Sequence, residues 1–334
     1  MRRSACCVAL ALLLTAGGCA PTLTLEDLRA SASPPARLTP APPDTLAFVV
    51  YGDNRLSRDR ADRASDSDRR QRRRAVTSAI SAERPDFVLH TGDLVEKGGD
   101  ESLWTLFQED TAPLLRPRFL YPAAGNHDYR GGLSRTYFDL FGETIQDAKS
   151  YAFRCGPACV IVLDSTSKPA PASQDTSGVH ARWFRERLRE ADQSHFLFVV
   201  LHHPPFSTGR GRVARILFDR HAGHAPRPQE RLLREMLADH LARRRARDPR
   251  ARTLVFSGHS HFYEHYIYRD LDFVVTGGGG APSHTPSETP PPHRVAAYRG
   301  DHYVRVVVTG DSLDILLKPV GRGIWIQRER QPKE

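Results

Sequence analysis

The chain has 334 residues, of which 40% are hydrophobic and 26% charged, and its 48 Lys and Arg against 39 Asp and Glu give a formal net charge of +9. This composition is typical of a globular protein and excludes a collagen-like, low-complexity or multispanning membrane chain. At roughly 100–200 residues per domain, the length allows one large domain or two small ones. Basicity alone is a weak indication of an anionic partner, so we expect nucleic acid only as a substrate, if at all.

Two arginines near the N-terminus precede an apolar run over 5–16, and small residues then lead to Cys19. The run has the length of a signal-peptide core and is shorter than the roughly 18–20 residues that span a bilayer. The small residues before the cysteine resemble a bacterial lipobox, so we expect 1–18 to be a lipoprotein signal peptide and Cys19 to be lipidated. Ala16 stands where a lipobox usually has Leu, and release as a secreted protein is therefore the alternative. The lipid would anchor an exported, periplasmic protein to the outer face of the cytoplasmic membrane or to the outer membrane.

Two of the five cysteines, Cys155 and Cys159, lie far from this signal. They flank a short turn between strand-like runs at 151–154 and 160–163, a spacing typical of the two arms of a tight hairpin. Because an oxidising compartment favours bridging, we expect a structural disulfide between them, with an unbridged pair as the alternative.

Residues 19–45 are rich in Pro and Ala and are predicted to form a flexible tether. From 46 to 320 apolar β-branched runs alternate with amphipathic stretches, which predicts one α/β domain, followed by a C-terminal tail over 321–334. In chain order the predicted strands are 46–52, 87–91, 119–123, 160–163, 196–201, 253–257, 273–276, 303–308 and 313–317, the predicted helices are 70–82, 102–115, 179–190 and 229–246, and long loops are expected at 207–228 and 281–299.

Five of the predicted strands lead directly into residues that bind metals well. Ligands of open α/β sheets bind outside the carboxyl ends of the strands, so these side chains are expected to converge. Carboxylate, amide and imidazole ligands together suit Mn, Fe or Zn better than Ca. Two ions about 3.5–4 Å apart, bridged by one carboxylate, would clamp a phosphate and lower the pKa of a shared water. The clusters are Asp53-Asn54-Arg55, Gly92-Asp93 with Gly98, Gly125-Asn126-His127-Asp128, His202-His203-Pro204-Pro205 and Gly258-His259-Ser260-His261.

The ordered series Asp53-x-Arg55, Gly92-Asp93-x4-Gly98, Gly125-Asn126-His127-Asp128, His202-x-Pro204 and Gly258-His259-x-His261 is similar to that of the calcineurin-like metallophosphoesterases, a superfamily that includes the purple acid phosphatases. The resemblance runs from about Leu46 to Leu317. It implies an α/β fold, a four-layer α-β-β-α sandwich of two mainly mixed sheets flanked by helices. It also makes 46–320 a catalytic domain with two divalent or trivalent metal ions at its centre.

The resemblance also implies two ligand sets. A first set would hold one metal with Asp53, Asp93 and His261. A second set would hold the other with Asp93 as the bridge, Asn126, His202 and His259. His127 would contact the phosphate and protonate the leaving oxygen, with Asp128 orienting its ring. We expect His203 to point away from the ligands, and His284 and His293 to be solvated loop residues.

Arg55 departs from the family pattern, since most members have a further His ligand at that position. Purple acid phosphatases lack that His and use a Tyr three residues after the bridging Asp, where this chain has Glu96. Three alternatives follow: Glu96 substitutes as a ligand, water fills the gap, or the first site is weak. Arg55 is a permanent cation, so we expect it to bind a phosphate oxygen of the substrate rather than a metal.

The resemblance implies a hydrolase of phosphate esters, of the phosphatase type, that uses two metals and a metal-activated hydroxide. One alternative is a phosphodiesterase or nuclease acting on cyclic nucleotides, glycerophosphodiesters or nucleic acid. An alternative of another class is a catalytically poor binding lipoprotein that keeps the fold.

Overall fold

The computed structural model describes residues 45–56, 65–115, 119–145, 149–166, 179–209 and 223–328. The chain divides into two units, Met1–Ser33 and Pro34–Glu334, and every described residue belongs to the second. The predicted signal peptide, Cys19 and nearly all of the predicted tether lie outside the described residues. In the described ranges, no helix combines the length and apolar character that a membrane span requires.

The described strands form one large mixed sheet in the order β3-β2-β1-β10-β8-β9-β7-β6-β5-β4, with β11 paired to β10. The parallel pairs join β1 to β2, β2 to β3, β5 to β6, β6 to β7 and β7 to β9. The strands are β1 (Thr45–Tyr51), β2 (Phe87–His90), β3 (Leu120–Pro122), β4 (Tyr151–Cys155), β5 (Ala158–Leu163), β6 (Phe196–Leu201), β7 (Arg252–Ser257), β8 (Tyr263–Tyr268), β9 (Leu271–Thr276), β10 (Arg294–Thr309) and β11 (Ser312–Gln327).

Strand β10 joins two halves of this sheet. Its residues 304–309 pair with β1, whereas its residues 294–298 pair with β8. The two halves pack face to face through aromatic rings: Phe48 of β1 lies 4.8 Å, centroid to centroid, from Phe198 of β6 and 6.4 Å from Phe256 of β7. The predicted layers are therefore confirmed, but backbone hydrogen bonds through β10 make the two predicted sheets one.

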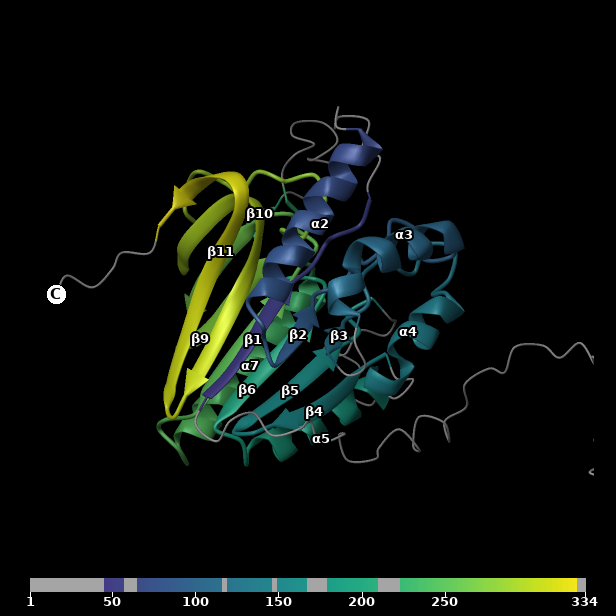
Figure 1. Ribbon diagram of the computed structural model, residues 1–334. Coiled ribbons are helices and arrows are strands. Elements are labelled where there is room, and N and C mark those ends of the chain that lie inside the picture. Colours follow the sequence, from purple (N-terminus) through teal and green to yellow (C-terminus); the bar gives the residue numbers. More distant parts are fainter. Residues whose placement is uncertain are drawn as a thin grey trace, which may run out of the picture. The chain divides into compact units, whose positions relative to one another are not determined.

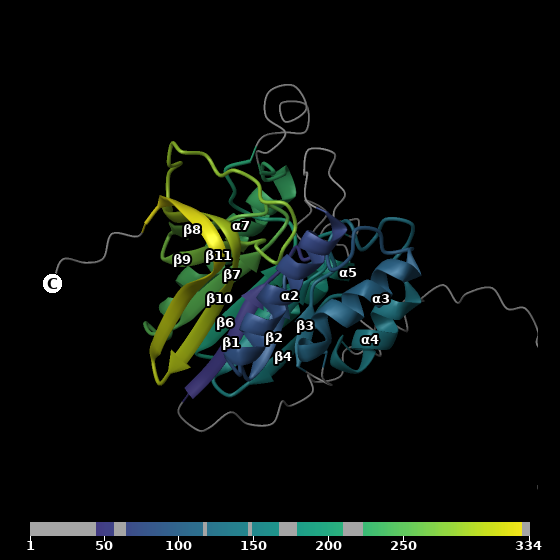
Figure 2. The same cartoon turned by 45° about the horizontal axis from the view of Figure 1, so that its top comes forward.

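Helices cover both outer faces. The described helices are α2 (Asp66–Ala82), α3 (Glu101–Thr111), a 3₁₀ turn (Ala112–Leu114), α4 (Arg135–Ile145), α5 (Val179–Ala191) and α7 (Pro228–Arg245). Figure 1 shows α2 in front of β1 and β2, while α5 and α7 lie behind the strands, and Figure 2 gives the same arrangement from a second angle. Leu188 of α5 and Leu237 of α7 belong to one apolar cluster with Val199 of β6, so both helices bury their apolar faces against that half of the sheet.

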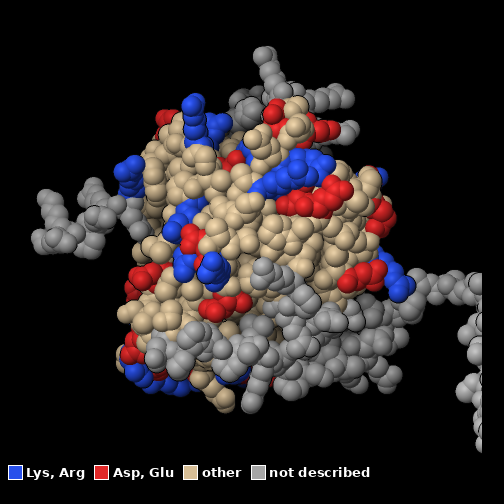
Figure 3. All heavy atoms as spheres, in the orientation of Figure 1, with Lys and Arg blue, Asp and Glu red and all other residues tan. Residues whose placement is uncertain are grey.

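Helix α2 begins with a capping box, in which Ser65 and Asp68 each hydrogen-bond the other's backbone N–H. Its arginines are held by ion pairs: Arg70 and Arg73 both contact Asp110 of α3, at 2.7 and 2.6 Å. On the face in Figure 3, basic and acidic side chains lie beside one another. On this face, therefore, the net positive charge does not gather into one basic surface.

Each of the nine predicted strands has a counterpart, but two elements were missed. Strand β8 has the sequence Tyr-Glu-His-Tyr-Ile-Tyr, which lacks the apolar run that identifies a buried strand. Its Glu264 carboxylate is nevertheless buried, because it pairs with Arg294, 2.9 Å away. Helix α4 was not predicted either. Strand β10 begins inside the loop expected at 281–299, and β11 continues to Gln327 through residues expected to be a tail.

The predicted disulfide is wrong. In the β4–β5 hairpin, Cys155 is paired with Ala158 and Cys159 with Arg154. Directly opposed residues share a face and successive residues alternate, so the two thiols point to opposite faces of the sheet. Accordingly Cys155 lies in the core between the two halves, and Cys159 lies in the cluster under α5 and α7.

Candidate metal centre

The predicted site residues converge at the carboxyl ends of the strands. Asp53 follows β1, Asp93 follows β2, His202 follows β6 and His259 follows β7. The ligand atoms of Asp53, Asp93 and His202 all lie within 4.8 Å of one another, and so do those of His202, His203 and His259. Residues that are up to about two hundred positions apart in sequence thus meet at one point, because parallel strands end at the same edge of a sheet.

Three of these residues hold a strained backbone. Asp53, Asp93 and His259 have φ values of 58°, 58° and 68°, in the left-handed region that non-glycine residues rarely adopt. Each such residue costs of order 1–3 kcal/mol, which surrounding contacts must offset. The Asp93 N–H, for example, donates to the Asp128 carboxylate at 3.0 Å. Backbone strain concentrated on predicted ligands is typical of a functional site.

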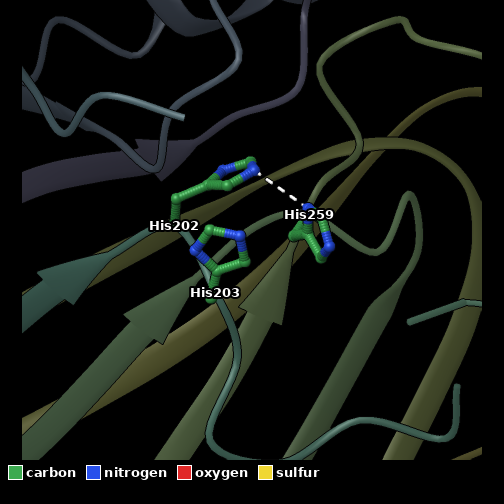
Figure 4. Close-up of side chains that lie close together, drawn as sticks. All are labelled: His202, His203 and His259. Carbon is green, nitrogen blue, oxygen red and sulfur yellow. Dashed lines mark hydrogen bonds between the residues drawn. The ribbon is translucent and has the colours of Figure 1, made fainter. Parts of the chain in front are cut away.

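The second ligand set is compact, and the tautomer of His202 is defined. His202 Nδ1 lies 2.9 Å from the Thr91 carbonyl oxygen, so Nδ1 carries the proton and the lone pair of Nε2 faces the site. That Nε2 lies 3.0 Å from His259 Nδ1, the contact drawn in Figure 4, and 3.1 Å from Asn126 Oδ1. Asp93 Oδ1 is 3.4 Å from the same nitrogen. Two imidazole nitrogens, an amide oxygen and a carboxylate around one point form a donor set that fits a divalent transition metal.

His203 differs from its prediction. Its ring lies 4.6 Å from that of His259, beside the second ligand set rather than away from it (Figure 4). His203 Nδ1 is held 2.9 Å from Ser165 Oγ, which also accepts the His203 backbone N–H. Burial lowers the pKa of His203 well below its usual value, so the ring is neutral. The sequence hid this placement because β6 ends at Leu201, so the alternation of side chains along the strand does not extend to His202 and His203.

The first ligand set contains a guanidinium. Arg55 Nε lies 3.3 Å from Asp93 Oδ2, and Arg55 Nη2 lies 3.5 Å from His261 Nε2. His261 Nε2 is also 3.5 Å from Asp53 Oδ1. His261 belongs to neither of the two groups whose ligand atoms lie within 4.8 Å of one another among the described residues. Asp53 and Asp93 do belong to one of those groups, together with His202, so the first set differs from the second in the guanidinium that faces His261 Nε2.

Asp128 does not orient His127, contrary to expectation. Its two carboxylate oxygens accept the backbone N–H groups of Asp93, Val95 and Gly125 at 2.8–3.1 Å. Asp128 thus holds together the two turns that present Asp93 and Asn126. Burial alone would raise the pKa of the Asp93 carboxyl, but the charge of Arg55 and the hydrogen bond from the His127 backbone N–H hold it below its usual value, so the carboxylate is ionised.

Glu96 takes the role expected of Asp128. His127 Nδ1 lies 3.0 Å from the Glu96 carbonyl oxygen and 3.1 Å from its carboxylate. The same carboxylate binds Arg55 and, at 2.8 Å, Arg130. Burial would raise the pKa of Glu96, but the hydrogen bond to His127 and the charge of Arg55 hold it below its usual value. In the structure, therefore, the Glu96 carboxylate links Arg55 to His127.

Two loop histidines also reach the centre. His284 is buried and its ring stacks on that of His261, with centroids 4.0 Å apart and planes 7° from parallel. Its Nδ1 accepts the His261 backbone N–H at 3.0 Å. The His224 ring centroid lies 3.9 Å from that of His259. The expectation that His284 is solvated is therefore wrong, and His224 was not predicted at all, because no periodic pattern in these loops marks either residue. His293 lies elsewhere, with its ring centroid 5.0 Å from that of Tyr268.

Close packing of the turns requires glycine at Gly125 and Gly92. A Cβ on Gly125 would collide with the Asp93 carboxylate and backbone nitrogen. Gly92 has a φ of 98°, and a Cβ there would meet Gly125 N and His202 Nδ1 at 2.8 Å. These two positions let the backbone approach the ligands closely.

Comparison with known proteins shows the family to which the chain belongs. Residues 47–263 match the family model of the calcineurin-like phosphoesterases, and the chain belongs to that family. Its candidate metal-binding residues lie at the strand ends, within the matched region.

Among particular proteins, the chain is 28% identical over 173 residues to a "probable cyclic nucleotide phosphodiesterase" of Rhodopseudomonas palustris, over 49% of this chain and 59% of the relative. The fold is similar to that of a purple acid phosphatase from yellow lupin, with a TM-score of 0.59, 16% identity and coverage of 87% of this chain and 55% of that one. It is also similar to a dimetal phosphatase from Danio rerio, with a TM-score of 0.55, 12% identity and coverage of 86% of this chain and 100% of that one. The chain thus spans little more than half the length of the first two proteins.

Proposed function

We propose that this chain is a phosphate-ester hydrolase, a metal-dependent phosphatase acting on phosphomonoesters. The observation that carries the proposal is the second ligand set, in which the His202 Nε2 lone pair meets His259 Nδ1 and Asn126 Oδ1 at 3.0 and 3.1 Å. His127 stands beside this set, with Nε2 3.8 Å from Asp93 Oδ2. A metal site next to a histidine that can transfer a proton is what phosphoryl hydrolysis needs.

The expected cofactor is a pair of divalent or trivalent ions, Mn, Fe or Zn. His202, His259, Asn126 and Asp93 would hold one such ion, which the donor chemistry fits. When bound, it would supply positive charge for the phosphate oxygens and lower the pKa of water at the site. Asp53 and His261 complete the set expected for the other ion, where the Arg55 guanidinium lies.

Arg55 is proposed to bind the phosphate. Its guanidinium lies beside the candidate metal centre, with Nε 3.3 Å from Asp93 Oδ2 and Nη2 3.5 Å from His261 Nε2. A guanidinium is a permanent cation that can bind two phosphate oxygens at once. Arg55→Ala is expected to raise KM for a phosphomonoester; an unchanged KM accompanied by loss of bound metal would contradict this role.

His127 is proposed to protonate the leaving oxygen from Nε2. Its Nδ1–H is held by Glu96, so a second proton must reside on Nε2 for the ring to act as an acid. The Glu96 carboxylate, 3.1 Å from Nδ1, stabilises that doubly protonated ring electrostatically. Glu96 is therefore a positioning residue for His127.

A phosphodiesterase acting on cyclic nucleotides is the second candidate. It is favoured by the name of the Rhodopseudomonas palustris relative, which matches about half of the chain. Glycerophosphodiesters and nucleic acid are further diesters that the same chemistry would accept. Lipid anchoring at Cys19 after export, supported by the signal-like N-terminus, is proposed for either activity.

The test compares initial rates on p-nitrophenyl phosphate and bis(p-nitrophenyl) phosphate in the presence of Mn²⁺, with Asp93→Asn as the blank. A rate that disappears in the variant supports a metal-dependent esterase. Preference for the monoester supports the phosphatase, and preference for the diester supports the second candidate. Equal rates for the wild type and Asp93→Asn would contradict both and favour a binding protein.

A further inference from the structure

The two carboxylate oxygens of Asp93 contact different groups. Oδ1 faces the second ligand set, 3.4 Å from His202 Nε2, and accepts the His127 backbone N–H at 2.9 Å. Oδ2 faces Arg55, with the guanidinium Nε 3.3 Å away. A carboxylate expected to bridge two metal ions thus faces one metal site and one arginine.

The His261 lone pair is also turned toward Arg55. His261 Nδ1 lies 2.7 Å from the Pro282 carbonyl oxygen, so Nδ1 carries the proton and Nε2 is an acceptor. Arg55 Nη2 is within 3.5 Å of that acceptor. The nitrogen expected to bind the first cation therefore accepts an N–H of Arg55.

Arg55 is fixed in this position by a second carboxylate. Its Nη1 forms an ion pair with Glu96, from the same turn as Asp93, and its side chain is only 10% exposed. The guanidinium therefore contacts Asp93, Glu96 and His261 at once. Because it stays protonated at every accessible pH, a cation entering between Asp53 and His261 would meet a permanent positive charge.

We propose that the Arg55 guanidinium occupies the place of the first metal ion, so that the chain binds one ion, at the second ligand set. The inference rests on the proposed metal dependence of the hydrolase. The positive charge beside Asp93 Oδ2 would then come from an arginine side chain and not from a bound metal ion. Metal removal would then take away one cation and leave the other in place.

The experiment counts metal ions without measuring turnover. The purified full chain is stripped with a chelator, equilibrated with excess Mn²⁺, passed through a desalting column and analysed for manganese per chain, with electron paramagnetic resonance on the same samples. We expect one ion per chain and the six-line signal of an isolated Mn²⁺. Arg55→His, which supplies a neutral ligand, is expected to bind two ions and give the multiline signal of an exchange-coupled pair.

Arg130→His is the matched control, because Arg130 also binds Glu96 but is 50% exposed. It is expected to keep one ion and the six-line signal. Two ions in the wild type would overturn the proposal whatever the variants do, and so would a single ion in a folded Arg55→His protein. No bound ion in the wild type would instead contradict the proposed metal dependence, which separates the two failures.

Discussion

His202 Nε2 lies 3.0 Å from His259 Nδ1, although the two residues follow different strands and are 57 positions apart in the sequence. Because Thr91 accepts the His202 Nδ1–H, the two nitrogens His202 Nε2 and His259 Nδ1 already lie in position to bind one metal ion. A ligand present at 100 times its Kd stabilises a fold by about 2.7 kcal/mol. We therefore expect Mn²⁺ or Zn²⁺ to raise Tm by a few degrees, measured by differential scanning calorimetry of the chelator-treated protein.

His202→Ala should abolish that metal-induced rise. The control is His195→Ala, because His195 lies at the opposite end of β6 from His202 and pairs with Asp248 at 3.4 Å. An equal rise in His202→Ala would place the ion elsewhere.

Loss of His127 should slow hydrolysis in a way that depends on the leaving group. Removing a general acid costs about 10²–10⁴-fold in rate. An alkyl phosphate, whose alkoxide must be protonated, should show the full loss in kcat for His127→Ala, and p-nitrophenyl phosphate much less. Glu96→Gln should show the same pattern more weakly, because it only positions the ring. Identical losses on both substrates would rule out proton donation by His127.

Asp128→Ala should destabilise the fold, although Asp128 lies next to His127 in the sequence. The substitution leaves three backbone N–H groups of the ligand turns without their acceptor. Each buried donor left unsatisfied costs about 1–3 kcal/mol. We expect a loss of several kcal/mol in the free energy of unfolding, measured by urea denaturation; a variant with wild-type stability and reduced kcat would instead favour the ring-orienting role.

Cys155 and Cys159 should both react as thiols. Alkylation of the denatured, unreduced protein followed by peptide mass spectrometry is expected to label both, because their side chains point to opposite faces of the β4–β5 hairpin. Detection of an intact bridge between them would contradict the hairpin register.

The stability of the protein should fall between pH 6.5 and pH 4 in part because of His302 of β10. Burial lowers the pKa of His302 from 6.5 to about 4. Above pH 6.5 both states are neutral at this ring, whereas at lower pH the unfolded chain binds a proton that the folded chain does not. At about 1.36 kcal/mol per pKa unit, the free energy of unfolding should be about 2 kcal/mol lower at pH 5 than at pH 7 from this group.

His302→Gln removes the titrating ring and should reduce that difference between pH 7 and pH 5, measured by urea denaturation at both pH values. Other buried histidines act in the same direction, so the comparison between the two proteins isolates His302. The same pH dependence in both would contradict a depressed pKa in the folded state.

The sequence by itself determined the strand order along the chain and the candidate ligands at the strand ends. Apolar β-branched runs reveal strands such as 196–201 directly, and Asp53, Asp93, His202 and His259 follow such runs immediately. Position relative to a strand end is a local property, because the chain direction alone brings the carboxyl ends of parallel strands to one edge.

Only the tertiary structure decided how the side chains pair around those ligands. Glu96, rather than the adjacent Asp128, holds His127 because Asp128 is drawn to three backbone amides. The distances from Arg55 to Asp93 and His261 join residues 38 and 206 positions apart, and no local pattern encodes such contacts. Cys155 and Cys159 show the same limit, because their separation depends on hairpin register and therefore on which face each strand residue buries.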